Sequence, residues 1–302
     1  MITIKKILCP VDFHPASQNA LKYATALAGS HNAKLKLLHV VEPLISSAYP
    51  YLLDVGSTSG SLKKDFEQRL EKVMAKVKSQ GVDVVSEVTL GNVALQIERV
   101  IGNYKPDLVT MGTHGRRGLE RWFMGSTTER LLRHSPVPLL TIADATKRRG
   151  DGLRFKRILV TTDFSDGTVD ALDHAFAVAQ ENDAHVTLLH VVHLPTAFSF
   201  EDGALFTEVE DELSKLIPSK VRRWCRVDIR VEEGTPYQVI LNTLEKEKID
   251  LLVMNIHGKG MLERALLGST AERVVRAARC PVMMIPPLAK SVEKAPVRKQ
   301  AA

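Results

Sequence analysis

The apolar positions of this 302-residue sequence follow two alternating patterns. Short, nearly continuous apolar runs are typical of strands buried on both faces of a sheet, and they occupy residues 5–11, 34–41, 82–90, 108–111 and 138–142. Apolar residues spaced three or four apart predict helices that begin at Pro15, span 62–77 and 93–101, and begin at Ser126. Residues 49–61, rich in Gly, Ser, Pro and Thr, are expected to form a loop. Strands that alternate with helices predict parallel β-α-β units and therefore an α/β fold.

The whole alternation occurs twice. Residues 6–13, KILCPVDF, return 151 residues later as RILVTTDF, and the run LLHVV returns at the same offset. From Gly91 onward the offset is 143 residues, so we place the eight-residue difference most simply in the loop 49–61. A repeat of this length predicts two tandem doubly wound domains, each with helices on both faces of a parallel sheet.

The predicted domains cover residues 1–144 and 153–287. A charged, glycine-bearing linker without periodicity, residues 143–155, joins them. Residues 288–302 are basic and contain few large apolar groups, so this tail is expected to be disordered.

Composition narrows the class of protein only modestly. Hydrophobic residues make up 44% and charged residues 25%, an ordinary globular balance, and the net charge of +6 does not require nucleic acid as a partner. Three cysteines without metal-ligand or redox spacing are typical of a reducing compartment. No apolar stretch approaches the roughly 18 residues of a membrane span, so a cytoplasmic protein is expected.

Candidate chemistry gathers in residues 111–129, MGTHGRRGLERWFMGSTTE. Gly112, Gly115 and Gly125 are separated by two and by nine residues, and they would let the backbone turn sharply or approach a ligand closely. Ser126 and Glu129 have capping-box spacing, which predicts a helix start beside Gly125. A helix start offers unpaired N–H groups and a positive dipole end, which suit a phosphate group.

Residues 254–272 of the second half repeat this stretch with one loss. Gly258, Gly268, Ser269 and Thr270 are retained, but Asn255 stands where the first half has Gly112. Asn tolerates a left-handed backbone, but its side chain is expected to crowd whatever passes Gly112 in the first half.

Other nucleotide motifs are missing from the sequence. There is no GxxxxGK[ST] and no GxGxxG, so neither a P-loop nor a dinucleotide fingerprint is supported. Arg116, beside Gly115, is a candidate for neutralising phosphate charge, and Mg²⁺ would accompany a triphosphate through substrate oxygens and water. No catalytic residue and no metal held by the protein are predicted.

On these residues the chain resembles the universal stress protein family in its tandem form. The complete signature in the first half is similar to that of the family's ATP-binding branch, and the family fold is a five-stranded parallel sheet of order 3-2-1-4-5. By position, the resemblance implies an adenine or ribose wall made of Pro10, Val11, Asp12 and Val40. It also implies ribose and phosphate contacts from Met111, Gly112, His114, Gly115, Gly125, Ser126 and Thr127. The matching positions of the second half are Asp163, Val191, Gly258, Gly268, Ser269 and Thr270, and Thr161 replaces Pro10 there.

Three functions remain open at this point. The first is a nucleotide-dependent regulatory protein of the stress response, the second a slow ATP hydrolase or nucleotidyl-transfer enzyme, and the third an interaction scaffold that binds no ligand. In this family isolated domains commonly dimerise through strand five. Residues 138–142 and 281–285 are apolar enough to pair in that way, either inside the chain or between two chains of a homodimer.

Overall fold

The computed structural model describes residues 3–42, 55–113, 124–144, 146, 154–193, 204–256 and 267–286. The proposed tail, residues 288–302, and most of the proposed linker lie outside them.

The first half alternates strands and helices as its apolar pattern predicts. Its strands are β1 (Lys6–Pro10), β2 (Lys34–Val41), β3 (Val84–Leu90), β4 (Leu108–Gly112) and β5 (Leu139–Ile142). Its helices are α1 (Pro15–His31), α2 (Val55–Lys78), α3 (Val93–Tyr104) and α4 (Ser126–His134).

The second half repeats the arrangement. Its strands are β6 (Arg157–Thr162), β7 (His185–Val192), β8 (Val227–Glu233), β9 (Leu251–Asn255) and β10 (Val282–Ile285). Its helices are α5 (Thr168–Asn182), α6 (Ala204–Lys215), α7 (Pro236–Lys246) and α8 (Ser269–Ala277), and a 3-10 turn, η1 (Val221–Arg223), precedes β8.

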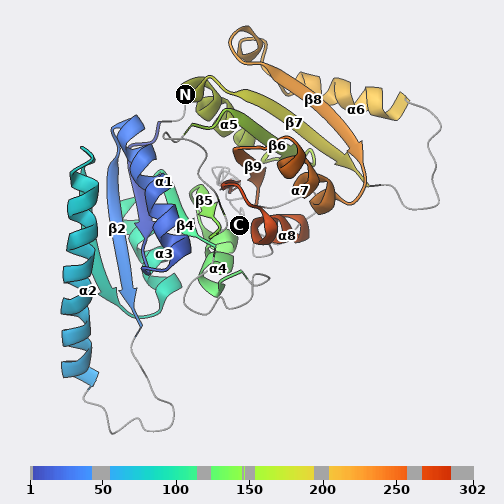
Figure 1. Cartoon of the computed structure of the whole chain (residues 1–302). Helices are drawn as coiled ribbons and strands as arrows, with labels where there is room; N and C mark the ends of the chain where they lie inside the picture. Colours follow the sequence, from blue (N-terminus) through green and yellow to red (C-terminus); the bar gives the residue numbers. More distant parts are fainter. Residues whose placement is uncertain are drawn as a thin grey trace, which may run out of the picture.

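The strands form one ten-stranded sheet of order β3-β2-β1-β4-β5-β10-β9-β6-β7-β8. Within each half all pairs are parallel and the order 3-2-1-4-5 is confirmed. The halves meet through β5 and β10, which pair antiparallel with Leu140 opposite Met283. Of the two pairing alternatives, the intramolecular one is therefore present, and Figure 1 shows β5 and α8 near the centre of the molecule with α2 and α6 at its outer edges.

Each face of the sheet carries a core that runs through both halves. Side chains of successive strand residues point to opposite faces, so Ile7 and Cys9 join one core and Leu8 joins the other. The first core is completed by α1, α2, α5 and α6, and the second by α3, α4, α7 and α8. Leu140 and Met283 belong to the first core, which makes the central strand pair part of a shared apolar interior.

One predicted loop is partly wrong. Helix α2 begins at Val55, inside the expected loop 49–61, and has 24 residues, whereas α6 has 12. The length difference between the halves therefore lies largely in this helix. Extending an established amphipathic helix by about two turns costs little once its packed face has formed, and this overrides the weak helix propensity of Gly and Ser.

No helix within the described ranges is both long and apolar enough to cross a membrane.

Candidate functional site

The carboxyl ends of β1, β2 and β4 lie side by side at one edge of the sheet, because β1 pairs with both of its neighbours in parallel. The Val11 N–H extends the ladder and donates to the Leu38 carbonyl at 2.8 Å. The structure thus brings a set of predicted site residues to the same edge: Pro10, Val11, Asp12, Val40, Met111 and Gly112. Such an edge is where open parallel sheets bind ligands.

Asp12 closes the turn between β1 and α1. Its carboxylate Oδ1 accepts from the His14 N–H at 2.9 Å, and its own N–H donates to the Ser17 hydroxyl at 3.3 Å. Ser17 also donates to the His14 carbonyl at 3.0 Å. The turn is therefore held from within, and the half-buried carboxylate keeps a fixed position at the strand edge.

Phe13 follows in a left-handed backbone conformation, with φ of 66°. Non-glycine residues seldom adopt this conformation unless the surroundings enforce it. Here the enforcing residue is His39 of β2, whose Nδ1–H donates to the Val11 carbonyl at 2.6 Å while its ring lies 5.0 Å from the Phe13 ring. Phe13 and His39 both recur 151 residues later, and this recurrence is the signal in the sequence that could have found the pair.

The second half has the same contacts between a histidine of its second strand and the turn after its first strand. Phe164 has φ of 60°, the His190 Nδ1–H donates to the Thr162 carbonyl at 2.8 Å, and the two rings lie 4.7 Å apart. Asp163 accepts from the Ser165 N–H at 3.0 Å, the counterpart of the bond between Asp12 and His14. Both halves therefore shape the turn after their first strand in one way.

Gly112 is required by helix packing. A Cβ at this position would lie 2.8 Å from the Ala16 carbonyl carbon and 2.9 Å from the Ser17 nitrogen. The start of α1 thus passes directly over the end of β4. The sequence offered a sharp turn or a ligand as the reason for this glycine, and within the described residues the reason is α1.

Helix α4 begins at Ser126 as predicted, but the capping box is wrong. Gly125 is the N-cap and no side chain caps the helix; Ser126 lies inside the first turn. Glu129 instead pairs with Arg133 at 2.7 Å, because the i,i+4 partner is within reach and the N-cap position has no side chain. The first N–H groups of α4 consequently receive no hydrogen bond from a capping side chain. Such a helix start is suited to binding an anion.

The position of α4 is set by the end of β4. The Gly125 N–H donates to the Thr113 carbonyl at 3.0 Å, and the buried Thr128 hydroxyl donates to the Gly112 carbonyl at 3.1 Å. Ser126, which is exposed, and Thr127, which is half-buried, are thereby fixed next to the strand edge. Thr128 was missed by the sequence analysis, because a threonine within a helix carries no distinctive pattern.

The second half retains most of this anchor. Gly268 is the N-cap of α8, again without a side-chain cap, and its N–H donates to the Ile256 carbonyl at 3.4 Å. Ser269 and Thr270 open the helix. Ala271 stands at the position of Thr128, so the hydroxyl bond is lost there. Val191, near the end of β7, is half-buried at the strand edge.

Four predicted contacts lie outside the described residues. They are His114, Gly115, Arg116 and Gly258. Their part in the site stays a prediction from the sequence.

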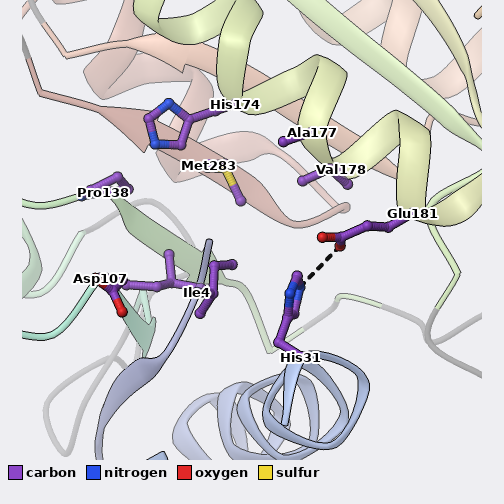
Figure 2. Close-up of a pocket in the computed structure, with 10 residues that line it drawn as sticks. Ile4, His31, Asp107, Pro138, His174, Ala177, Val178, Glu181 and Met283 are labelled. Carbon is purple, nitrogen blue, oxygen red and sulfur yellow. Dashed lines mark ion pairs between the residues drawn. The ribbon is translucent and has the colours of Figure 1, made fainter. Parts of the chain in front are cut away.

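A pocket exists at the opposite ends of the strands, between the two halves. It has a volume of about 20 Å³ and its lining includes Leu108, the first residue of β4, and Pro138, which precedes β5. Ligand sites of drug-sized molecules have roughly 300–1,000 Å³, so this pocket does not fit a nucleotide. Figure 2 shows His31 of α1 and Glu181 of α5 facing each other across it, 3.1 Å apart.

No three His, Cys, Asp or Glu side chains of the described ranges gather in a way that could hold a metal ion. Complete burial raises the pKa of the Cys9 thiol, and burial likewise raises the pKa of Cys225, so both are protonated at neutral pH.

Comparison with known proteins agrees with the duplicated architecture. The profile of the universal stress protein family matches residues 3–143 and 154–286. A universal stress protein of Mycolicibacterium smegmatis is 27% identical over 291 residues, which cover 93% of this chain and 97% of that protein. A universal stress protein of Methanocaldococcus jannaschii is 38% identical over 152 residues, covering 48% of this chain and 89% of that protein.

A solved structure shows the same fold over the whole chain. The crystal structure of a universal stress protein from Archaeoglobus fulgidus superposes with a TM-score of 0.72 at 21% identity and covers 94% of this chain and 97% of that one. The fold and the repeated strand-edge site define a tandem α/β protein with two doubly wound halves. The chain belongs to the universal stress protein family.

Proposed function

We propose that this chain binds ATP together with Mg²⁺ at the strand edge of its first half and acts as a nucleotide-dependent regulatory protein of the stress response. The observation that carries the proposal is the start of α4: a glycine N-cap, no side-chain cap, and an anchor to the end of β4. Preorganised N–H groups at a helix start bind phosphate without a further reorganisation cost.

The neighbouring turn supports an adenine nucleotide rather than a simple anion. Asp12 lies at the end of β1, the strand between β2 and β4, with its carboxylate held by the His14 N–H and its backbone N–H held by the Ser17 hydroxyl. A carboxylate in this place suits a ribose hydroxyl, because an ionised carboxylate only accepts hydrogen bonds. The apolar side chain of Val40, at the end of β2, offers a contact for the base.

Titration calorimetry with ATP and Mg²⁺ tests the proposal. We expect saturable binding, and Gly125→Val should remove the share of it that belongs to the first half, because a branched side chain would occupy the space in front of the α4 amides. Asp12→Asn should weaken binding while leaving the thermal midpoint close to that of the wild type, because the amide oxygen can still accept from the His14 N–H. An absence of heat at millimolar ATP would overturn the proposal.

The regulatory role predicts that the nucleotide is held intact. Phosphoryl transfer needs a group that orients the nucleophile and carboxylates that hold the metal ion, and the described site contributes Asp12 alone. Nucleotide recovered unchanged after hours with the purified protein would support a regulatory role. Sustained ADP release that is lost in Asp12→Ala would instead assign a slow hydrolase.

A further inference from the structure

The two halves fill the space between their fourth strand and first helix in opposite ways. In the first half Gly112 on the strand faces Ala16 on the helix, and a Cβ on Gly112 would lie 2.9 Å from the Ala16 Cβ. In the second half the matching residues are Asn255 and Gly167, and a Cβ on Gly167 would lie 3.1 Å from the Asn255 side chain. The larger residue on β9 is therefore matched by a smaller one at the start of α5.

Asn255 uses this space to hydrogen-bond the turn before α5. Its amide nitrogen donates to the Gly167 carbonyl at 2.9 Å, and its oxygen accepts from the Thr168 N–H at 3.1 Å and from the Ser165 hydroxyl at 3.2 Å. This orientation of the amide is assigned from the hydrogen-bond network, because in the reverse orientation its oxygen would face acceptors and its nitrogen would face donors. All three partners lie between Ser165 and Thr168. The amide thus faces α5 and acts as a cap supplied from a distant strand.

The capped turn contains the candidate ligand residue of this half. Ser165 receives the Asn255 contact through its hydroxyl and, through its N–H, donates to Asp163 Oδ1 at 3.0 Å. A continuous path of two hydrogen bonds therefore runs from the end of β9 to the Asp163 carboxylate. In the first half the turn is held by Ser17 of α1, whose hydroxyl accepts from the Asp12 N–H and donates to the His14 carbonyl.

We propose that Asn255 is a positioning residue for Asp163, acting through Ser165, and that Gly167 is the small residue that makes room for it. The proposal rests on nucleotide binding as proposed above. It replaces the expectation that Asn255 crowds the ligand: the residue that passes Gly112 is Ala16 of α1, and the second half has a glycine in that place. The departure from the glycine signature is thus compensated, and the second half retains an oriented carboxylate at its strand edge.

Hydrogen exchange of the full chain tests the hydrogen bonds of Asn255 to the turn before α5 without any ligand. In Asn255→Gly the amides of residues 163–172 should exchange about tenfold faster, the order expected when a helix cap is lost. Asn92→Ala is the matched control, because Asn92 caps α3 by accepting from the Leu95 N–H at 3.1 Å and lies in the other half. It should accelerate exchange at the start of α3 and leave residues 163–172 unchanged. Unchanged exchange of residues 163–172 in Asn255→Gly would overturn the proposal.

A second experiment separates positioning from packing. In a Gly125→Val background, which removes the first site, Asn255→Gly should weaken ATP binding about tenfold, the order for a lost positioning hydrogen bond. Asn255→Gly combined with Gly167→Ala recreates the pair of the first half; it should regain the thermal midpoint but not the ATP affinity. Affinity that rises in Asn255→Gly would show that Asn255 obstructs the ligand, and affinity that fully returns in the double variant would show a packing role only.

The same titrations keep the two proposals apart. Binding by the wild type together with none in Gly125→Val would uphold the proposed function and overturn the positioning role. No binding by the wild type would overturn the proposed function, and with it the role of Asn255 toward a ligand.

Discussion

The hydroxyl of Thr128 donates a hydrogen bond of 3.1 Å to the carbonyl oxygen of Gly112, the last residue of β4. It also lies 3.4 Å from the Thr113 carbonyl oxygen. These contacts join the end of a strand to the first turn of α4. The strand edge and the helix start, which 13 intervening residues separate along the chain, are thereby one rigid element of the candidate site.

Thr128→Val should lower the free energy of unfolding by about 1–2 kcal/mol, because two buried carbonyl groups lose their shared donor. ATP affinity should fall as well, since the α4 amides are no longer held against the strand edge. Urea unfolding and calorimetry measure the two effects. Thr128→Ser keeps the hydroxyl and is the control; equal behaviour of the two variants would contradict the assigned role.

Gly112→Ala should destabilise the protein by about 1–3 kcal/mol, because the added methyl group meets the backbone of α1 at 2.8 Å. The control is Gly102→Ala, a helical glycine of α3 whose added Cβ would meet nothing within 4 Å. It should be stabilising by about 0.5–1 kcal/mol. Urea midpoints that shift in the same direction for both variants would refute the packing explanation.

His39→Ala should lower the free energy of unfolding by about 2–4 kcal/mol, because a fully buried ring and its hydrogen bond to Val11 are removed together. The turn that carries Asp12 should loosen, so protease cleavage or amide exchange near Phe13 should increase. His134→Ala, at the exposed end of α4, should stay within about 0.5 kcal/mol of the wild type. A stable His39→Ala protein with an unchanged turn would show that Phe13 holds its own conformation.

The ion pair between His31 and Glu181 predicts an unusual pH dependence. Burial raises the pKa of Glu181 above its ordinary value, and the attraction of His31 opposes this only in part. The folded protein therefore holds the proton more tightly than the unfolded chain, and this stabilisation is lost as the pH rises through the folded pKa. Glu181→Gln does not titrate, so its thermal midpoint relative to the wild type should be higher at pH 7 than at pH 4.

The partner of Glu181 provides the control. In a His31→Gln background the opposing attraction is gone. The gain in thermal midpoint that Glu181→Gln gives at pH 7 over pH 4 should therefore be larger in that background. A midpoint difference that shrinks from pH 4 to pH 7 would mean that the ion pair outweighs the cost of burial.

The shared core predicts that the halves unfold together. Met283 of β10 is 3% exposed and lies opposite Leu140 of β5. Met283→Ala should therefore lower the free energy of unfolding by about 2–4 kcal/mol and lower the midpoint of one common transition. Leu95→Ala, 52% exposed, should cost about 0.5 kcal/mol or less. Scanning calorimetry that resolves two transitions, only one of them shifted, would show that the halves unfold independently.

The fold was accessible from the sequence, because buried parallel strands and amphipathic helices differ in the period of their apolar residues. The strand at 34–41 was predicted at the bounds that β2 has, and the helix starts at Pro15 and Ser126 were also confirmed. The start of α2 was missed, because weak helix formers such as Gly and Ser are carried into a helix by the packed segment that follows them.

The sequence by itself determined the duplication and the alternation of strands with helices, because these follow from local periodicity and from one repeated pattern. The family resemblance supplied the strand order, and the stretch in which a ligand would bind stays a prediction. Only the tertiary structure decided which face of Gly112 is crowded, that Gly125 replaces Ser126 as the cap, and that Asn255 turns toward Gly167. Each of these depends on a contact between segments far apart in the chain, and the direction of a side chain across such a contact is set by packing, which no local pattern records.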